Sequence, residues 1–279
     1  MESLKGLKLL AQGGQAQIYH YGENKVLRVL RNPDDADLLK YEIYIMKALK
    51  SRMDVPEVFE DMIIEGRPAV VVERIDGISM LDYMKRHPLR LKEQAALLAR
   101  LHTKMPDSVD IKGLGPSKGR ARYLIGQAKI SGEAKEFVRD VLEGLPEGTA
   151  LCHGDFHPGN ILKSGEKNYL IDWFGAYKGP LLSDAAHTYL LLKNVPRFPG
   201  IGSVQHKLIK GSGALIAKTY LNAFHRLQPF DWTLFSQWLL VKAAERACYG
   251  LEPEKPALVR FIAACMDCSY QPESWYKKL

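Results

Sequence analysis

The chain has few cysteines, no long apolar run and no low-complexity tract, and each absence excludes a class of protein. Its four cysteines among 279 residues are too few and too clustered for a secreted disulfide framework. No apolar run approaches the roughly 20 residues that cross a bilayer. The opening sequence MESLKGLKLLAQGG has an early acidic residue and too short an apolar stretch for a signal peptide. We therefore expect a cytoplasmic protein without a membrane partner.

The charge balance is basic, and it permits an anionic partner without specifying one. The formal net charge is +7 and the pI is about 9.1, which suits a nucleotide, a phosphate or a nucleic acid. Lys and Arg are nevertheless spread along the chain, and their densest groups lack interleaved aromatic residues. This pattern favours a solvated surface, so we expect no nucleic-acid partner. Cys265 and Cys268 form a C-x-x-C within a predicted helix; buried thiols are favoured there over a redox or metal role.

The first 75 residues have the pattern of strands with one helix. LKLL, AQGGQAQIYHY and KVLRVLR predict three short strands joined by tight turns. Asp34 or Asp35 can cap a helix over residues 36–52, where apolar residues recur at helical spacing. Residues 57–75 then predict a hairpin with its turn at Gly66-Arg67.

From about residue 79 the pattern is mainly helical. Residues 106–120 are predicted as loop, and NILKSGEKNYLIDW as a second hairpin that turns at residues 164–167. Further helices are predicted around 133–145, 181–193, 204–226, 231–249 and 254–268. The predicted fold class is α+β, with a small antiparallel β lobe with one helix (1–76) and a larger, mainly helical lobe (77–279).

The segment LCHGDFHPGNIL, residues 151–162, concentrates hydrogen-bonding side chains between apolar flanks. Asp155 precedes Asn160 by five residues, and Asp172 ends an apolar strand in the hairpin that follows. Phosphoryl transfer needs a carboxylate to orient and deprotonate the acceptor hydroxyl, and oxygen ligands to hold Mg²⁺ against the phosphates. A strand–turn–strand return would bring Asp172 near Asn160. A polar loop with capping roles is the alternative.

HGDFHPGN followed by IDW resembles the aminoglycoside phosphotransferase and choline kinase-like family, which has the bilobal protein-kinase fold. The resemblance implies an ATP- and Mg²⁺-dependent enzyme, with GTP as an alternative nucleotide. It implies that Asp155 is the catalytic base, that Asn160 and Asp172 are metal ligands, and that His153 supports the loop. It makes Asp184 a residue that holds the loop backbone, whereas N-capping of the helix that it opens is an equally physical interpretation.

The family expects a strand lysine that bridges the phosphates, and this chain departs from that pattern. Val26, Arg28 and Leu30 share one face of KVLRVLR, while Lys25 and Arg31 lie on the other. In the kinase-like pattern an apolar residue two positions before the cation covers the adenine, which selects Val26 with Arg28. The opposite face is expected to pack on the helix or to meet solvent.

Other nucleotide contacts follow from the same resemblance. Glu42, early in the first helix, is the natural partner for Arg28, although a plain surface Glu is the alternative. Gly13 and Gly14 can form a turn whose backbone amides cover phosphates, but they would equally suit any tight turn. VVERIDG resembles an inter-lobe hinge, in which backbone groups of Glu73 and Ile75 would bind the adenine edge.

The sequence says less about the molecule that accepts the phosphoryl group than about the nucleotide that donates it. Only 12 positions separate Asp172 from Asp184, too few for the activation segment that docks a peptide, so a small-molecule acceptor is expected. His157, Trp173 and Glu245 are the candidates for contacts with it; for His157 a structural role or a minor acceptor contact is favoured over a role as second base. Acidic side chains are scattered, and aromatic ones at helical spacing are more often core, so aminoglycosides, amino alcohols, sugars and nucleosides all remain candidate substrates.

The leading hypothesis is a kinase of a small-molecule hydroxyl, acting as a monomer or homodimer. The main alternative is a nucleotide-binding pseudokinase or regulatory module. Retention of Asp155, Asn160 and Asp172 argues against that alternative, and Arg28 in place of lysine argues for it. Transfer of a nucleotidyl group to a protein is a third hypothesis, and the leaving product distinguishes it from kinase chemistry.

Overall fold

The computed structural model describes residues 3–108, 111, 113–196, 200 and 202–279, and contacts divide the chain into two compact units. The β-rich unit is Met1–Tyr83, Ile111–Gly113 and Pro158–Gly175, and the helical unit is Met84–Asp110, Leu114–His157 and Ala176–Leu279. The predicted α+β class, with an antiparallel sheet beside one helix and a larger helical part, is confirmed. Residues 158–175 group with the N-terminal strands, and the functional division at residue 76 stays a prediction.

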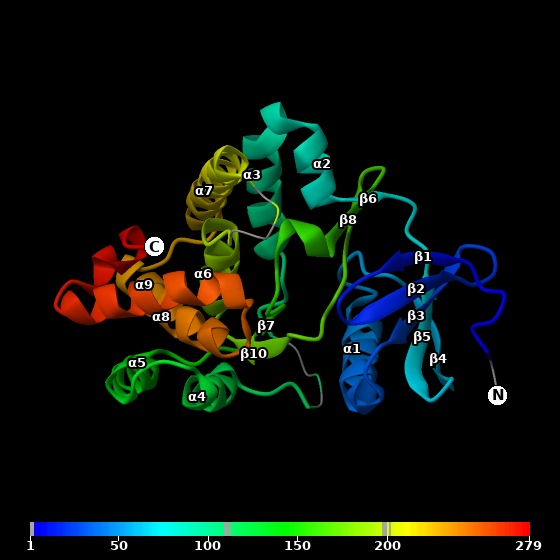
Figure 1. Cartoon of the computed structure of the whole chain (residues 1–279), viewed down its shortest axis with the longest axis horizontal. Helices are drawn as coiled ribbons and strands as arrows, with labels where there is room; N and C mark the ends of the chain where they lie inside the picture. Colours follow the sequence, from blue (N-terminus) through cyan, green and yellow to red (C-terminus); the bar gives the residue numbers. More distant parts are fainter. Residues whose placement is uncertain (1–2, 109–110, 112, 197–199, 201) are drawn as a thin grey trace. The chain divides into compact units, whose positions relative to one another are not determined.

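An antiparallel sheet in the order β1-β2-β3-β5-β4 forms the first part of the β-rich unit (Figure 1). Its strands are β1 (Leu9–Gln12), β2 (Ala16–His20), β3 (Lys25–Leu30), β4 (Val58–Ile64) and β5 (Arg67–Glu73). The turn between β4 and β5 has positive φ at Glu65 (50°) and Gly66 (76°), as a type I′ hairpin requires. The predicted turn at Gly66-Arg67 was therefore wrong by one residue.

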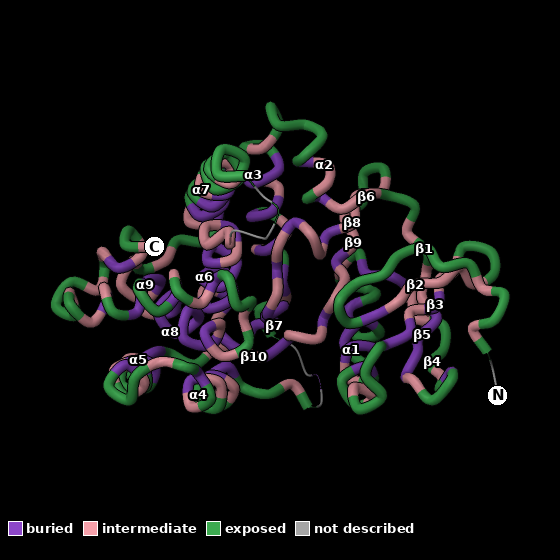
Figure 2. The backbone as a smooth tube through the Cα atoms, viewed as in Figure 1, coloured by how far each residue is buried: buried purple, intermediate pink, exposed green. Residues whose placement is uncertain are grey.

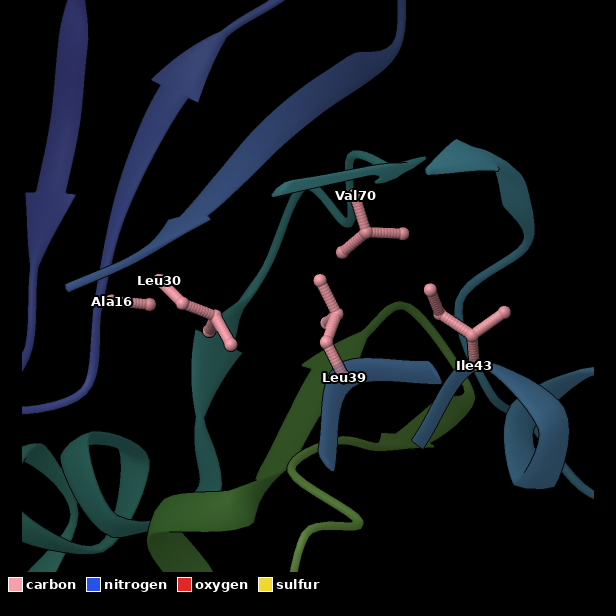
Figure 3. Packing of buried hydrophobic residues seen from close by; sticks show 5 residues of the cluster. All are labelled: Ala16, Leu30, Leu39, Ile43 and Val70. Atoms are coloured by element: carbon pink, nitrogen blue, oxygen red, sulfur yellow. The ribbon is translucent and has the colours of Figure 1, made fainter. Parts of the chain in front are cut away.

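Helix α1 (Ala36–Leu49) covers one face of this sheet. The core between them consists of buried aliphatic side chains that interlock from both sides, as Figure 3 shows. It is formed by Ala16, Leu30, Leu39, Ile43 and Val70.

The strand face opposite Arg28 was expected to pack on the helix or to meet solvent, but α1 packs on the Arg28 face and the opposite face is covered by the N-terminal segment. Leu30, on the Arg28 face, contacts the α1 cluster, whereas Leu27 and Val29 pack on the other side with Leu4 and Leu7 of the N-terminal segment. Both faces of β3 are apolar, so strand alternation separates the two faces without saying which of them the helix covers.

Helix α1 begins at Ala36 with Asp35 at its N-cap position, as predicted, but the Asp35 side chain makes no capping hydrogen bond. Asn32, rather than Asp34 or Asp35, provides the capping side chain: its oxygen accepts a hydrogen bond from the Asp34 N–H at 3.2 Å. This begins the 3₁₀ turn Pro33–Asp35 (η1), which leads into α1. Pro33 favours this start because its fixed φ suits the first helical position.

A second antiparallel sheet carries the later hairpin of the β-rich unit. It has the order β6-β8-β9, with β6 at Ile78–Ser79, β8 at Ile161–Ser164 and β9 at Lys167–Leu170. The short 3₁₀ helix η3 (Pro158–Asn160) precedes β8. A Cβ atom on Gly77 would lie 2.1 Å from the Lys163 carbonyl oxygen, so only glycine permits this close strand approach.

The helical unit is organised around α8, which contacts α4, α5, α6 and α9 and is buried along most of its length (Figure 2). A second contact group joins α3 and α6 to α7. The helices are α2 (Met80–Arg86, which starts in the β-rich unit), α3 (Leu91–His102), α4 (Ser117–Gln127), α5 (Gly132–Gly144), α6 (Leu181–Lys193), α7 (Ser203–Leu227), α8 (Trp232–Tyr249) and α9 (Lys255–Asp267). Short 3₁₀ turns are η2 (Pro88–Arg90), η4 (Glu252–Glu254) and η5 (Pro272–Lys277).

Most predicted helices of this unit are confirmed within two residues of their ends, but two features were missed. Helix α4 begins at Ser117, inside the stretch predicted as loop. Strands β7 (Ala150–Cys152) and β10 (Tyr177–Gly179) form an antiparallel pair that local pattern did not reveal. Within the described part of the chain, no helix combines the length and apolar character needed to cross a membrane.

Two neighbouring leucines of α1 test the packing of the sheet against the helix. Leu39 is 3% exposed and Leu38 is 49% exposed. We expect Leu39→Ala to lower the free energy of unfolding of the β-rich unit by about 2–5 kcal/mol, because it leaves a cavity in the core. Leu38→Ala, the matched control, should change it by less than about 0.5 kcal/mol. Urea denaturation measures both, and equal losses would contradict the packing.

Candidate active site

The β-rich unit contains a cavity of about 820 Å³ that collects most of the predicted nucleotide contacts. Strands, the turn after β1, the segment after β5 and the end of the second hairpin all contribute to its walls. The predicted residues that line it are Gly13, Gly14, Val26, Arg28, Glu42, Glu73, Ile75 and Asp172. Apolar walls that the sequence did not single out include Ile18, Met46, Val72, Leu162 and Ile171.

The glycine turn between β1 and β2 is held from its outer side. Gly13 N–H donates to the Ala16 carbonyl at 2.9 Å, and Arg31 Nε donates to the Gly13 carbonyl at 3.0 Å. A Cβ atom on Gly14 would meet nothing within 4 Å. The packing of the chain itself therefore does not require glycine there, and the bare backbone leaves room for a ligand to approach closely.

Of the three cations considered in KVLRVLR, Arg28 is the one that lines the cavity. Its Nη1 donates to Glu42 Oε2 at 2.5 Å, which is the pairing that the sequence analysis expected. Its Nη2 lies 3.8 Å from Asp172 Oδ1. Lys25 instead lies over the Phe59 ring, 4.3 Å from its centroid, and Arg31 binds the glycine turn. Strand parity therefore selected the cation that faces the cavity.

Glu42 is fully buried, and its environment acts on its pKa in both directions. Burial raises the pKa and is the largest effect, while the positive charge of Arg28 lowers it and the negative charge of Asp172 raises it. The net direction is upward. The carboxylate also accepts the Trp173 N–H at 3.1 Å through its second oxygen, so both oxygens have donors.

The second hairpin brings the backbone of Asn160 beside Asp172, as predicted. Ile161 pairs with Leu170 across the ladder, and Ile171 N–H donates to the Asn160 carbonyl at 3.1 Å. Asp172 has φ of 67°, in the left-handed region that residues other than glycine rarely adopt. The hydrogen bond of the preceding residue, Ile171, therefore holds the backbone beside Asp172, whose own conformation is strained.

The chemistry of Asn160 and Asp172 fits a hard divalent cation. One amide oxygen and one carboxylate are ligands that Mg²⁺ accepts, and Mg²⁺ completes its shell with water and phosphate oxygens rather than with an all-protein cage. No group of three or more His, Cys, Asp or Glu side chains placed to hold a metal occurs among the described residues.

The loop that carries Asp155 belongs to the helical unit, and the side chain of Asp184 binds its backbone. Asp184, which is buried, accepts the His153 N–H at 2.7 Å and the Gly154 N–H at 2.9 Å. His102 Nε2 lies 3.1 Å from the same carboxylate. These are the loop-holding contacts that the resemblance implied. The capping interpretation was wrong, because Pro180 occupies the N-cap position of α6.

Further contacts fix the same loop. Thr188 Oγ1 donates to the Phe156 carbonyl at 2.8 Å, and the ring of the buried His153 meets the Phe156 ring edge-on. Gly154 has φ of 76°, a conformation that glycine adopts without strain. The backbone on both sides of Asp155 is therefore tied to α6.

Asp155 is a carboxylate at neutral pH. Burial alone would raise its pKa, but the hydrogen bond and charge of His157, with smaller effects of His187 and His153, hold the pKa below its usual range. His157 Nε2 lies 3.5 Å from Asp155 Oδ2. Burial and the nearby Arg246 lower the pKa of His187 to about 3, so that ring is neutral.

Two predicted acceptor contacts lie in positions that suit packing. Trp173 is fully buried, and its indole N–H donates to the Leu170 carbonyl at 3.4 Å. Glu245 is 2% exposed and accepts Lys242 Nζ at 3.0 and 3.2 Å. Both positions fit internal structure rather than an open binding surface, whereas His157 is partly exposed beside Asp155.

Residues missed by the sequence analysis act through partners that are distant in sequence. His102 reaches Asp184 across 82 positions and contacts Tyr220 OH through its other ring nitrogen at 2.6 Å. Phe174 lies under the Arg28 guanidinium, 4.8 Å from ring centroid to Cζ. The sequence around His102 carries no local signal for its contact with Asp184, because an apolar helix that ends in histidine is common. The contact of Phe174 with Arg28 could have been sought in the residues that follow IDW.

The fold and these residues together define a chain of the phosphotransferase class. A sequence profile described as the phosphotransferase enzyme family matches residues 6–199, well over half of the 279 residues. The chain belongs to this family. A comparison with curated protein sequences found no match.

Solved structures with the same fold cover nearly the whole chain. Aminoglycoside phosphotransferase APH(4)-Ia has a TM-score of 0.65 at 16% identity, over 96% of this chain and 94% of that one. The amicoumacin kinase hAmiN, in complex with AMP-PNP, Ca²⁺ and Ami, has a TM-score of 0.58 at 14% identity, over 94% and 88%. The GDP and kanamycin complex of APH(2")-IIia has a TM-score of 0.55 at 15% identity, over 95% and 93%. At these identities the similarity establishes the fold.

The support of the Asp155 loop by Asp184 can be tested with an isosteric change. We expect Asp184→Asn to lower the free energy of unfolding by about 1–3 kcal/mol, because an amide has one acceptor oxygen where two backbone N–H groups need partners. Turnover should fall with it. Asp231→Asn is the matched control, since Asp231 caps α8 through the Leu234 N–H and asparagine caps equally well. Thermal unfolding of both variants decides, and a stable Asp184→Asn would contradict the loop-holding role.

Proposed function

We propose that the chain is an ATP- and Mg²⁺-dependent phosphotransferase whose acceptor is the hydroxyl group of a small molecule. One observation carries the proposal: a single cavity is lined by a guanidinium, its buried carboxylate partner and a second carboxylate that ends the Asn160 hairpin. Transfer of a phosphoryl group depends on positioning and charge stabilisation of this kind.

The cavity suits a purine nucleotide in size and polarity. Its volume of about 820 Å³ lies within the range of roughly 300–1,000 Å³ that ligand sites occupy. Val26 and Val72 would face one side of the base and Leu162 and Ile171 the other. Glu73 N–H already donates to the Glu57 carbonyl at 2.8 Å, so Glu73 would use its carbonyl oxygen and Ile75 its N–H. ATP and GTP both fit this proposal.

Arg28 would neutralise phosphate charge, and Asn160 and Asp172 would hold Mg²⁺. When bound, the metal supplies positive charge that stabilises the developing negative charge on the transferred group. The structural contribution of the chain is to hold the two ligands on the two ends of a short hairpin, joined by the hydrogen bond from Ile171 to Asn160.

Asp155 would orient the acceptor hydroxyl and take its proton. Its pKa, held below the usual range, keeps it ionised but makes it a weak base. A weak base suffices, because in a loose transition state the hydroxyl loses its proton late. Five peptide links join Asp155 to Asn160, which limits their Cα separation to roughly 18 Å.

The short connection between Asp172 and Asp184 supports a small acceptor. It contains β10 and the first residues of α6, and no segment long enough to dock a peptide. Complexes among the similar structures contain hygromycin B, Ami or kanamycin, so the proposed substrates are aminoglycosides, amino alcohols, sugars or related compounds. A cytoplasmic monomer or homodimer without nucleic-acid or membrane partners completes the proposal.

The test is ADP release from ATP and Mg²⁺ across acceptors that include aminoglycosides, amino alcohols, sugars, nucleosides and macrolides. We expect acceptor-dependent ADP release that Asp155→Asn reduces by about 100- to 10,000-fold, the usual contribution of a general base, while nucleotide binding persists. Asp140→Asn, an exposed acid of α5, serves as the control.

Three results would contradict the proposal in different ways. Turnover that survives in Asp155→Asn would remove the base. Pyrophosphate in place of ADP would indicate nucleotidyl transfer. Nucleotide binding without turnover on any acceptor would favour the pseudokinase alternative.

A further inference from the structure

The Arg28 guanidinium makes three contacts within the β-rich unit, and each uses a different part of the group. Nη1 donates to Glu42 Oε2 at 2.5 Å, Nη2 lies 3.8 Å from Asp172 Oδ1, and Cζ lies 4.8 Å from the Phe174 ring centroid. The side chain is 15% exposed, compared with 33% for Asp172. Arg28 is therefore an ordered bridge between β3, α1 and the segment 172–174.

Glu42 connects the same three elements from the other side. Its Oε2 accepts Arg28, and its Oε1 accepts the Trp173 N–H at 3.1 Å. The peptide that follows Asp172 and the cation beside Asp172 are thus bound to one buried carboxylate. Displacement of either would release a constraint on Asp172.

Phe174 supplies a flat surface for the guanidinium. Its ring packs on the core of Ala16, Leu30, Leu39, Ile43 and Val70, so its position is fixed by the sheet and α1. A planar guanidinium stacks on such a ring while its edge donors reach carboxylates. The ring therefore bounds one side of the guanidinium while Nη1 and Nη2 face Glu42 and Asp172.

Asp172 needs such support because its own backbone resists the observed conformation. Its φ of 67° is sparsely populated by residues other than glycine and persists only where the surroundings enforce it. The Trp173 N–H on Glu42 and the Ile171 N–H on Asn160 hold the backbone on either side. The Arg28 guanidinium contacts the Asp172 carboxylate itself.

We propose that Arg28 is a positioning residue that holds the Asp172 carboxylate ready for the metal, and that this position requires arginine rather than lysine. The inference rests on the proposed function for its metal and nucleotide. An ammonium group on a flexible stem has no fork with which to span two carboxylates. Lysine would keep the charge that the phosphates need but would leave Asp172 less well placed.

Arg28→Lys and Phe174→Leu test this, with Lys25→Ala as the matched control on the opposite face of β3. Binding of a non-hydrolysable ATP analogue is measured by calorimetry with and without Mg²⁺, in the absence of any acceptor. We expect Arg28→Lys to weaken Mg²⁺-dependent binding about tenfold, the size of one charge-assisted contact, and to change Mg²⁺-free binding little. Phe174→Leu should act in the same direction, and Lys25→Ala should match the wild type.

A second measurement needs no ligand. Hydrogen exchange of the peptide that contains Trp173 should be faster in Arg28→Lys and Phe174→Leu than in the wild type, because the segment loses its bridge. Wild-type exchange together with wild-type Mg²⁺-dependent binding in Arg28→Lys would overturn the inference. A wild-type protein that binds no nucleotide would instead refute the proposed function, while the exchange comparison would still decide whether arginine fixes the segment.

Discussion

The buried carboxylate of Glu42 is the constraint on which the candidate nucleotide site depends. A charge without solvent is stable only if donors surround it, and removal of one partner of a buried pair costs about 3–5 kcal/mol. Arg28 and the Trp173 N–H are those donors. The hydrogen bonds of this one carboxylate therefore connect strand β3, helix α1 and the segment after Asp172. Arg28, Glu42 and Asp172 line the cavity, so these bonds also hold part of its wall.

The helical unit uses the same principle around Asp184. Two backbone N–H groups and His102 surround its carboxylate. Burial would raise the pKa of Asp184, but the hydrogen bond and charge of His102, with smaller effects of His153 and His187, hold the pKa below its usual range. Because the folded-state pKa is lowered, the stabilisation is complete at neutral pH and is lost as the pH falls below the ordinary carboxyl range. The backbone of the loop that leads into Asp155 is thus held by a buried charge.

Much of the fold could be predicted from sequence because its signals are local. Hairpin turns, strand alternation and helical spacing predicted the β8–β9 return and helices α6 to α9 nearly to the residue. The errors arose where local pattern is silent. Both faces of β3 are apolar, so strand alternation could not show that α1 covers the Arg28 face and that the opposite face is also buried. Helix α4 carries Gly119 and Gly126 and few apolar residues, so its helical character depends on packing against α8.

The sequence by itself determined which reactive side chains are present and how they are spaced. Asp155 and Asn160 are five positions apart, a hairpin brings Asp172 back toward Asn160, and Arg28 shares a strand face with Val26. Periodicity and short loops are enough for that, since each involves neighbours along the chain. Only the tertiary structure decided that Trp173 and Glu245 are buried, that His102 supports Asp184, and that Phe174 carries Arg28. Those outcomes depend on which surfaces meet when apolar area is buried, and residues far apart in sequence settle them together.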